Sequence, residues 1–344
     1  MRKVYVLCPS DTVTGGIELL HQLVDVLRNQ NIEAFIKYIG NESAKIPNAY
    51  LKYNLRIADS VSNIEESIIV IPEVFFYLLP KFEKAYKVVL WWLSVDNFIN
   101  DSCSFDYLFT NNFYNQKLKN RLIQSYFKKI IKLFLFKPSI FQTISIHELV
   151  SYSNLINACQ SQYAMDFCES FGFMNICLLS DFINTEFLEH EKTEKKDIII
   201  YNPKKGKQFT KKLIKSAKNL TFVPICNMNR EQVKQLMFDS KVYIDFGNHP
   251  GKDRMPREAC LCDCLIITGK DGAAYNEKDI EIPEYYKLAG NKKNIKEIIS
   301  KIENCLTEYD IRLSDFLSYK NKILNEKQEF EDQAINLFSQ IVQE

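Results

Sequence analysis

Glycine and proline are scarce in this sequence, and it has no long apolar run and no excess of either charge. Its 344 residues include only 10 glycines and 10 prolines, which argues against collagen-like and linker-rich chains. The 44 basic residues almost balance the 43 acidic ones, so the whole chain is neither a disordered polyelectrolyte nor a tail-driven nucleic-acid binder. No stretch approaches the roughly 18 uninterrupted apolar residues of a membrane span. What remains is a globular chain long enough for two domains of roughly 150 residues.

No secretory signal is expected either, because Pro9 ends the first apolar run too early for a signal-peptide core. The ten cysteines are therefore expected to be free thiols in a reducing, cytoplasmic compartment. Cys260, Cys262 and Cys264 alternate across an expected helix-to-strand junction, and no pair of histidines follows them. This pattern does not favour a structural metal.

Short apolar runs alternate with amphipathic stretches along the chain, which is typical of parallel sheets flanked by helices. The expected strands are Val4–Cys8, Ala34–Tyr38, Ile68–Ile71, Val88–Leu93, Tyr107–Phe109, Leu155–Ala158, Met174–Leu178, Ile198–Tyr201, Leu220–Pro224, Val242–Asp245 and Leu265–Thr268. A final helix is expected over Glu326–Glu344, where the apolar residues share one face. The fold class is α/β, with two Rossmann-like lobes at 1–182 and 183–325 and a closing helix at 326–344.

Two loops after expected strands carry residues that a sheet core would not select. Gly15 and Gly16 precede a helix, where backbone N–H groups can approach a phosphate or a sugar; a plain tight turn is the alternative. Lys205 and Gly206 follow the strand Ile198–Tyr201 and suit a diphosphate; a solvated basic loop is the alternative.

Two further loops lie in the second lobe. In residues 249–264 a charged loop runs into Pro256 at an expected helix start, with Glu258 in the first turn. Glu258 can accept two ribose hydroxyls while Arg254 or Lys252 faces phosphates, or it can simply complement the helix dipole. In the last loop, small residues can present backbone N–H groups to a phosphate or a hexose. The residues of that loop are Gly272, Ala273, Ala274 and Asn276.

The stretch from Pro250 to Thr268 reads P-G-K-D-R-M-P-R-E-A-C-L-C-D-C-L-I-I-T. It resembles the nucleotide-sugar loop of retaining GT-B glycosyltransferases of the group 1, family 4-like type, whose usual form is E-G-F-G-L-P-x-x-E-A-M-A-x-G-x-P-V-I. The pair Lys205-Gly206, the Gly15-Gly16 turn and the two-lobe layout extend the resemblance over most of the chain. It implies GT-B architecture, with the C-terminal helix packed back on the N-terminal lobe.

The resemblance also implies roles for individual residues. Glu258 would bind the ribose, Lys205 the donor diphosphate, and residues 272–276 the sugar. The family's first glutamate would fall at Pro250, so this sequence departs from the pattern there, and Asp253 could substitute for it. Lys205 and Arg254 would stabilise the leaving diphosphate. No D-x-D motif sits at a strand end, so neither a metal nor a cofactor is expected.

The N-terminal half would bind the acceptor, for which the family offers no portable motif. Asp96 is expected to be exposed at the end of the strand Val88–Leu93, either as a catalytic residue or as a helix N-cap. His147 is either structural or catalytic.

Between Tyr107 and His147 there are seven cations and no acidic residue. A basic face and an apolar face at helical spacing favour an interfacial helix on anionic lipid, with a solvated core helix as the alternative. Lys128, Lys129, Lys132 and Phe134 are the expected membrane contacts.

The sequence therefore predicts a hexosyltransferase-type, metal-independent and retaining enzyme that acts on a nucleotide sugar. Its acceptor would be a glycan, in particular a lipid-linked surface polysaccharide or lipooligosaccharide, and the enzyme would be peripheral at the inner face of the cell membrane. The alternatives are an epimerase-like enzyme that modifies nucleotide sugars and a non-catalytic protein that binds them.

Overall fold

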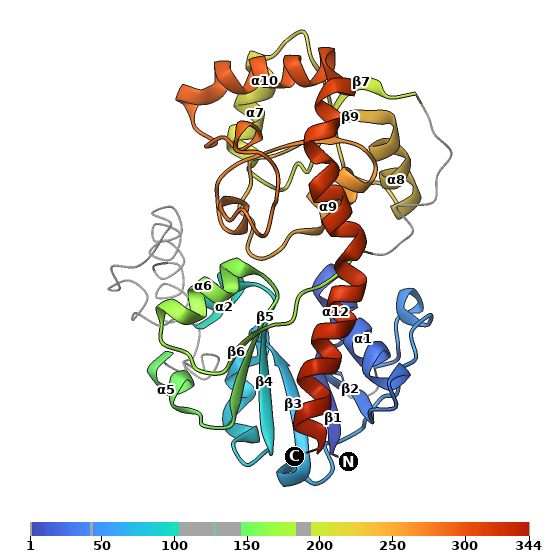
Figure 1. Cartoon of the computed structure of the whole chain (residues 1–344), viewed down its shortest axis with the longest axis vertical. Coiled ribbons are helices and arrows are strands. Elements are labelled where there is room, and N and C mark those ends of the chain that lie inside the picture. Colours follow the sequence, from blue (N-terminus) through green and yellow to red (C-terminus); the bar gives the residue numbers. More distant parts are fainter. Residues whose placement is uncertain (1, 42–43, 103–126, 128–145, 184–193, 344) are drawn as a thin grey trace. The chain divides into compact units, whose positions relative to one another are not determined.

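The computed structural model describes residues 2–41, 44–102, 127, 146–183 and 194–343 (Figure 1). The chain divides into two compact units. Unit 1 comprises Met1–Asp181 together with Gln328–Glu344, and unit 2 comprises Phe182–Lys327. The expected strand Tyr107–Phe109 lies outside the described residues. None of the helices in the described ranges is long and apolar enough to cross a membrane.

Unit 1 contains a six-stranded parallel sheet in the order β2-β1-β3-β4-β5-β6. Its strands are β1 Lys3–Pro9, β2 Ala34–Ile39, β3 Ser67–Pro72, β4 Lys87–Trp92, β5 Leu155–Cys159 and β6 Ile176–Leu178. Its helices are α1 Gly15–Asn29, α2 Val95–Ser102, α5 Ile146–Ser151 and α6 Gln162–Ser170, with 3-10 turns at Asn48–Tyr50, Ile64–Glu66 and Glu73–Phe82. Each expected strand in the described part of this unit is present, and none of its ends is shifted by more than two residues.

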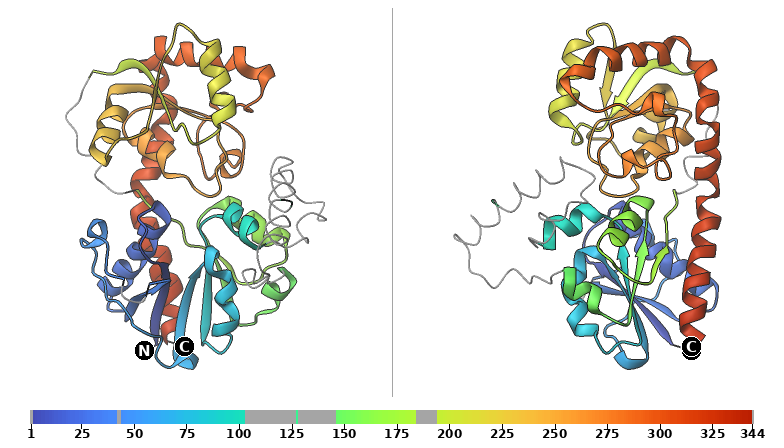
Figure 2. Two further views of the ribbon diagram at one scale, coloured as in Figure 1. Left: turned by 180° about the vertical axis from the view of Figure 1, so that it is seen from behind. Right: turned by 60° about the vertical axis from the view of Figure 1, so that its left-hand side comes forward.

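Helices cover both faces of this sheet (Figure 2). Two adjacent tryptophans at the end of β4 each pack on the helices of one face. Side chains of consecutive strand residues point to opposite faces. Trp91 stacks on Phe330 of α12 Leu317–Gln343, with ring centroids 6.2 Å apart, and its indole N–H donates to the Leu179 carbonyl at 2.8 Å. Trp92 packs on Phe98 of α2 and on Phe167 of α6. The central strands are therefore apolar on both sides, as in other parallel sheets.

Unit 2 contains a four-stranded parallel sheet in the order β10-β9-β7-β8. Its strands are β7 Lys196–Tyr201, β8 Thr221–Pro224, β9 Ser240–Asp245 and β10 Leu265–Thr268. Its helices are α7 Lys207–Ser216, α8 Arg230–Asp239, α9 Arg254–Leu261, α10 Ile295–Thr307, α11 Tyr309–Arg312 and the first part of α12, with 3-10 turns at Ala273–Tyr275, Glu284–Tyr286, Lys292–Asn294 and Leu313–Phe316.

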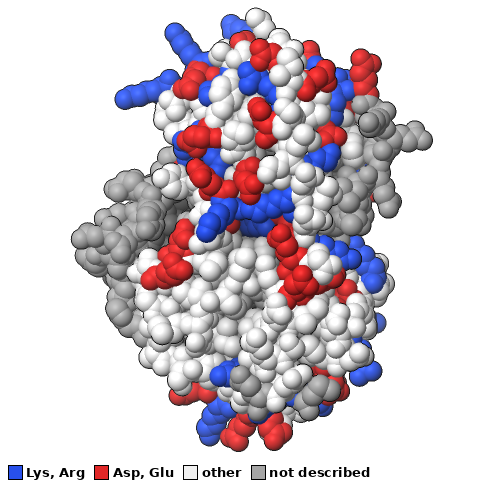
Figure 3. Space-filling model, in the orientation of Figure 1, with Lys and Arg blue, Asp and Glu red and all other residues white. Residues whose placement is uncertain are grey.

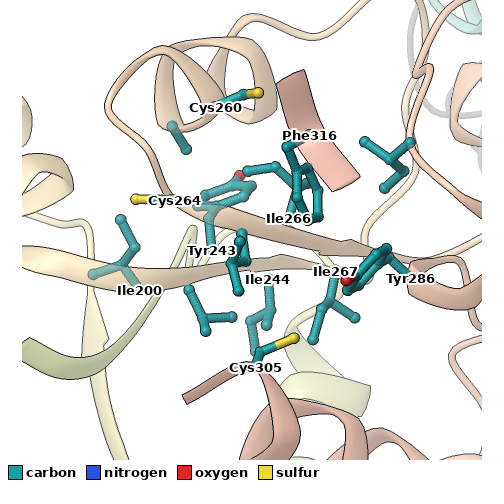
Figure 4. Packing of buried hydrophobic residues seen from close by; sticks show 14 of the residues in the cluster. Ile200, Tyr243, Ile244, Cys260, Cys264, Ile266, Ile267, Tyr286, Cys305 and Phe316 are labelled. Atoms are coloured by element: carbon teal, nitrogen blue, oxygen red, sulfur yellow. The ribbon is translucent and has the colours of Figure 1, made fainter. Parts of the chain in front are cut away.

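Cysteines fill part of the core of unit 2. Figure 4 shows Cys264 beside Tyr243, Cys260 on the helix above them and Cys305 below Ile244. Burial raises the pKa of the Cys264 thiol to about 11, and it also raises the pKa of Cys260. Neutral thiols behave as small apolar side chains, so these residues serve packing.

The C-terminal helix is longer than expected, since α12 begins at Leu317 and not near Glu326. The buried stripe of this helix runs through Tyr319 and Ile323 to Glu326 before it reaches Phe330. A carboxylate in the middle of the stripe interrupts the apolar period that marks a helix in the sequence.

Phe330→Ala is expected to destabilise the protein by about 3–5 kcal/mol, because it removes a fully buried ring stacked on Trp91. Glu329→Ala changes the exposed neighbour on the same helix and is the matched control. Urea unfolding of both variants measures the difference. Equal stability of the two would show that this end of α12 does not belong to the core of unit 1.

Candidate functional site

Three loops of unit 2 follow neighbouring parallel strands. Residues 202–206 follow β7, residues 246–253 follow β9, and residues 269–276 follow β10. The carboxyl ends of parallel strands meet at one edge of a sheet, which is where open α/β sheets bind ligands. The loops that the sequence singled out in this unit therefore lie at one edge.

Lys205 is the central cation of this edge. Its Nζ contacts the Asp253 carboxylate directly and lies 3.7 Å from Oδ2 of Asp245. The lysine side chain keeps 24% of its surface exposed, whereas the Asp245 side chain is fully buried. Asp245 is held by the Gly247 N–H at 2.8 Å and by the Tyr243 hydroxyl at 3.1 Å. The buried carboxylate of Asp245 and the carboxylate of Asp253 together position the Lys205 ammonium group, which solvent can still reach.

His249 completes the cluster and was not singled out from the sequence. Its ring is fully buried, with Nδ1 2.9 Å from Oδ2 of Asp253 and Nε2 3.7 Å from Oδ1 of Asp245. Burial by itself raises the pKa of the Asp253 carboxyl, but His249 and Lys205 outweigh that effect and hold the pKa below its ordinary value. Asp253 is therefore charged at neutral pH. A sign that could have revealed His249 is its place four residues after Asp245 and four before Asp253.

Two glycines allow the loops to approach one another. Gly206 has φ of +54°, and a Cβ there would stand 2.5 Å from the Phe246 carbonyl oxygen. Gly272 has φ of +65°, and a Cβ there would stand 2.1 Å from the His249 carbonyl oxygen. Both contacts are too short for any side chain. The glycine of the expected Lys205-Gly206 pair is therefore required by packing between the loops after β7 and β9.

Helix α9 begins at Arg254, with Asp253 at its N-cap. The Asp253 carboxylate makes no cap hydrogen bond, in keeping with its contacts to Lys205 and His249. Glu258 consequently lies in the second turn, and the expectation that it sits in the first turn was wrong. Its Oε1 is 3.7 Å from Nε of Arg254, and both side chains remain partly exposed. Because the helix dipole acts mainly on the first turn, it does not account for Glu258.

Backbone groups of the loop after β10 are already hydrogen-bonded, both within the loop and to His249 and Lys287. The Ala273 N–H donates to the His249 carbonyl at 2.9 Å, so this amide does not present itself to a ligand as the sequence suggested. The Asn276 N–H donates to the Ala273 carbonyl at 3.0 Å, and Nζ of Lys287 donates to the Asn276 carbonyl at 3.2 Å. Ala274 is also buried. The loop is ordered before any ligand binds.

A buried cluster of three charged side chains, which was not predicted from the sequence, holds the loop after β9 in place. Glu326 of α12 accepts from Arg257 at 2.7 Å and pairs with Nζ of Lys252 at 2.7 Å. Arg257 also donates to the backbone carbonyls of Asp253 and Lys252, both at 3.1 Å. The three side chains are almost fully buried. Because Lys252 pairs with Glu326, the expectation that Lys252 could face phosphates was wrong. Of the two cations named for that role, Arg254 remains.

The other expected residues belong to unit 1 or fall outside the described residues. Gly15 and Gly16 are the first two residues of α1 and follow its N-cap residue, Thr14. Asp96 is buried in the first turn of α2 and accepts from the Tyr163 hydroxyl at 2.9 Å, so the expectation of an exposed Asp96 was wrong. Ser94 caps the helix instead, accepting from the Asn97 N–H at 3.2 Å.

His147 lies on α5, and its side chain is not among those described. Lys128, Lys129, Lys132 and Phe134 lie outside the described residues.

One cluster in the described part of the chain has the composition of a metal site, namely Asp245, His249 and Asp253, whose ligand atoms lie within 4.8 Å of one another. The Lys205 ammonium already pairs with both carboxylates. A divalent cation at the same place would be repelled by that charge, so the donor set suits a lysine better than a metal.

Comparisons with solved structures assign the fold. HepE from Anabaena, solved with UDP-glucose, aligns with a TM-score of 0.59 at 10% identity over 99% of this chain and 100% of its own. A glycosyltransferase from Rickettsia africae aligns with a TM-score of 0.60 at 12% identity over 99% and 98%. WaaG, described as a glycosyltransferase involved in lipopolysaccharide biosynthesis, aligns with a TM-score of 0.53 at 12% identity over 96% and 98%. The chain has the GT-B fold.

The fold inferred from the loop motif is therefore confirmed. No protein-family model and no curated relative matches the sequence. At identities near 10% the likeness concerns the fold, and the activity has to be argued from the site.

Glu326→Ala is expected to destabilise the protein by about 3–5 kcal/mol, because it leaves Arg257 and Lys252 buried without their carboxylate. Glu326→Gln keeps an acceptor and should lose less. Glu329→Ala, on the exposed side of the same helix, is the control in urea unfolding. A loss below about 1 kcal/mol for Glu326→Ala would mean that the three side chains do not form the buried group described here.

Proposed function

We propose that this protein is a glycosyltransferase whose unit 2 binds a nucleotide-sugar donor. The observation that carries the proposal is the position of Lys205. It is a partly exposed ammonium group, held by two carboxylates at the carboxyl ends of β7 and β9, in a chain with the GT-B fold. HepE, which shares that fold, was solved with UDP and with UDP-glucose.

Lys205 and Arg254 act on the donor diphosphate. Negative charge grows on the diphosphate as the bond to the sugar breaks, and preorganised cations stabilise that charge most where water is excluded. In the described structure Asp253 holds Lys205, so the diphosphate competes with this carboxylate for the ammonium group. Asp245 stays buried beneath and keeps Lys205 at the site during the exchange.

The remaining donor contacts come from the neighbouring loops. Glu258 accepts the ribose hydroxyls from the second turn of α9, where its side chain is partly exposed. Asp253 and the 272–276 loop contact the transferred sugar. Because Ala273 and Ala274 are buried, the loop makes this contact at its accessible end, at Tyr275 and Asn276. No metal ion takes part, because Lys205 and Arg254 supply the positive charge at the diphosphate. The anomeric configuration is retained, as the resemblance of the 250–268 stretch to retaining enzymes implies.

Unit 1 binds the acceptor, and the backbone N–H groups at Gly15 and Gly16, at the start of α1, bind a phosphate or a sugar of the donor. Asp96 would take part in catalysis only if its carboxylate were released from Tyr163. The acceptor is a glycan of surface polysaccharide or lipooligosaccharide type, carried on a lipid. WaaG, which has the same fold, is described as acting in lipopolysaccharide biosynthesis.

The protein binds the inner face of the cell membrane peripherally. Support for this comes from the sequence alone, through Lys128, Lys129, Lys132 and Phe134 in a stretch without acidic residues.

An epimerase of the Rossmann type would carry G-x-G-x-x-G after the first strand, and Val13-Thr-Gly-Gly16 does not supply it.

Transfer and donor-hydrolysis assays with a panel of nucleotide sugars test this function. Glu258→Ala is expected to lower kcat/KM by about 30- to 1000-fold, equivalent to about 2–4 kcal/mol, because it removes a carboxylate that binds two hydroxyls.

Lys205→Ala should lower kcat more than it raises the donor KM, because its charge acts mainly on the leaving group. Lys204→Ala, an exposed neighbour without an ion pair in the described structure, is the control.

Three outcomes would contradict parts of the proposal. A kcat/KM within threefold of wild type for Glu258→Ala would remove the donor-loop assignment. Unchanged turnover in Lys205→Ala would move the diphosphate to Arg254. Tight donor binding without turnover of any donor would favour a non-catalytic binding protein.

A further inference from the structure

The described residues 202–230 contain eight basic residues and no acidic one, although the charges of the whole chain nearly balance. One of the eight is Lys205 of the donor site, and another is Arg230 at the start of α8. The remaining six are all exposed lysines on α7 and its two flanks: Lys204, Lys207, Lys211, Lys212, Lys215 and Lys218. Within the described part of the chain, none of these six forms an ion pair.

Helix geometry gathers three of these lysines into one row. Lys207, Lys211 and Lys215 are four residues apart, so successive side chains rise by about 6 Å and turn by only about 40° around the helix. Thr210 and Leu213 occupy the other side of the helix and are buried. The row therefore points away from the core of unit 2.

The segment packed against α7 adds further positive charge. Gly290 lies against Phe209 of α7, since a Cβ at Gly290 would stand 3.4 Å from the Phe209 ring. Lys292, Lys293 and Lys296 follow Gly290 and are exposed. The nearest acidic residue along this segment is Glu297, which pairs with Lys301 at 3.6 Å. On the face of unit 2 seen in Figure 3, cations and carboxylates are intermixed.

The kinds of residue present limit the partner. Every exposed residue of α7 is lysine, glutamine or serine. Arginine, which binds single phosphates by a planar fork, is absent from the helix, and so is an exposed aromatic ring that could stack on a base or a sugar. Among the apolar side chains of α7, Leu213 is buried and Phe209 is partly buried against the core of unit 2. Hydrated point charges without a stacking or inserting group suit a diffuse anionic layer, such as the headgroups of a bilayer.

We propose that the exposed lysines of α7 form a second membrane-contact surface, which binds anionic lipid headgroups by charge alone. This surface belongs to unit 2, whereas Lys128, Lys129 and Lys132 belong to the N-terminal half of the sequence. It does not depend on the proposed transferase activity, because it can be measured without donor or acceptor. Its binding differs from that of an inserted amphipathic helix in being fully reversed by salt.

The experiment is sedimentation of the full chain with phosphatidylcholine vesicles, with and without phosphatidylglycerol, at low and high salt. The variant Lys207→Glu/Lys211→Glu/Lys215→Glu should lose affinity for the anionic vesicles by on the order of 100-fold at low salt. Lys45→Glu/Lys81→Glu/Lys84→Glu changes the net charge equally at exposed lysines of unit 1, and should lose much less. Circular dichroism and thermal unfolding establish that both variants fold.

The milder variant Lys207→Gln/Lys211→Gln/Lys215→Gln should show a smaller loss in the same direction. Combining the α7 changes with Lys128→Glu/Lys129→Glu/Lys132→Glu should lower affinity further if both surfaces bind. Equal losses in the α7 variant and the unit 1 control would overturn the proposal, as would salt-resistant binding or equal binding to neutral vesicles. A variant that binds vesicles normally but loses binding to heparin would also overturn it, in favour of a soluble polyanion. Donor hydrolysis by the α7 variant tests the transferase function separately.

Discussion

The buried carboxylate of Glu326 is the constraint on which the geometry of unit 2 depends. It pairs with both Arg257 and Lys252, and Arg257 in turn donates to the backbone carbonyls of Asp253 and Lys252. That fixes the N-cap of α9 and, with it, the Asp253 carboxylate that contacts Lys205. Removing one member of such a group leaves an uncompensated buried charge, so the group behaves as a unit. Glu326 of α12 thereby sets the position of Lys205 on the loop after β7.

The same arrangement bears on the diphosphate-binding role proposed for Lys205. Asp245 is buried and accepts from Gly247 and Tyr243, whereas Asp253 and Lys205 keep partial access to solvent. An ammonium group between two carboxylates is preorganised, and a diphosphate has to displace only one of them. Preorganisation lowers the cost of binding, and the remaining buried carboxylate keeps the lysine directed to the edge of the sheet.

Much of the fold could be predicted from the sequence, because parallel strands buried on both faces read as short apolar runs. The loops after β7 and β9 were also recognised, since Lys205 and Glu258 follow strand ends. Residues whose role arises from tertiary contact could not be recognised. His249 and Asp245 look like ordinary loop and strand residues, and Glu326 interrupts the apolar period of α12. Asp96 was expected to be exposed because nothing in the sequence places Tyr163 beside it.

A crystal structure of the full chain with a nucleotide-sugar donor, or with the nucleoside diphosphate that it yields, tests the central claim most directly. The account predicts the diphosphate within hydrogen-bonding distance of Lys205 and Arg254, with Lys205 moved away from Asp253. It also predicts the ribose hydroxyls on Glu258 and the sugar beside residues 272–276. A nucleotide bound elsewhere, or bound at this edge with Lys205 still held by Asp253 and Glu258 out of reach of the ribose, would contradict it.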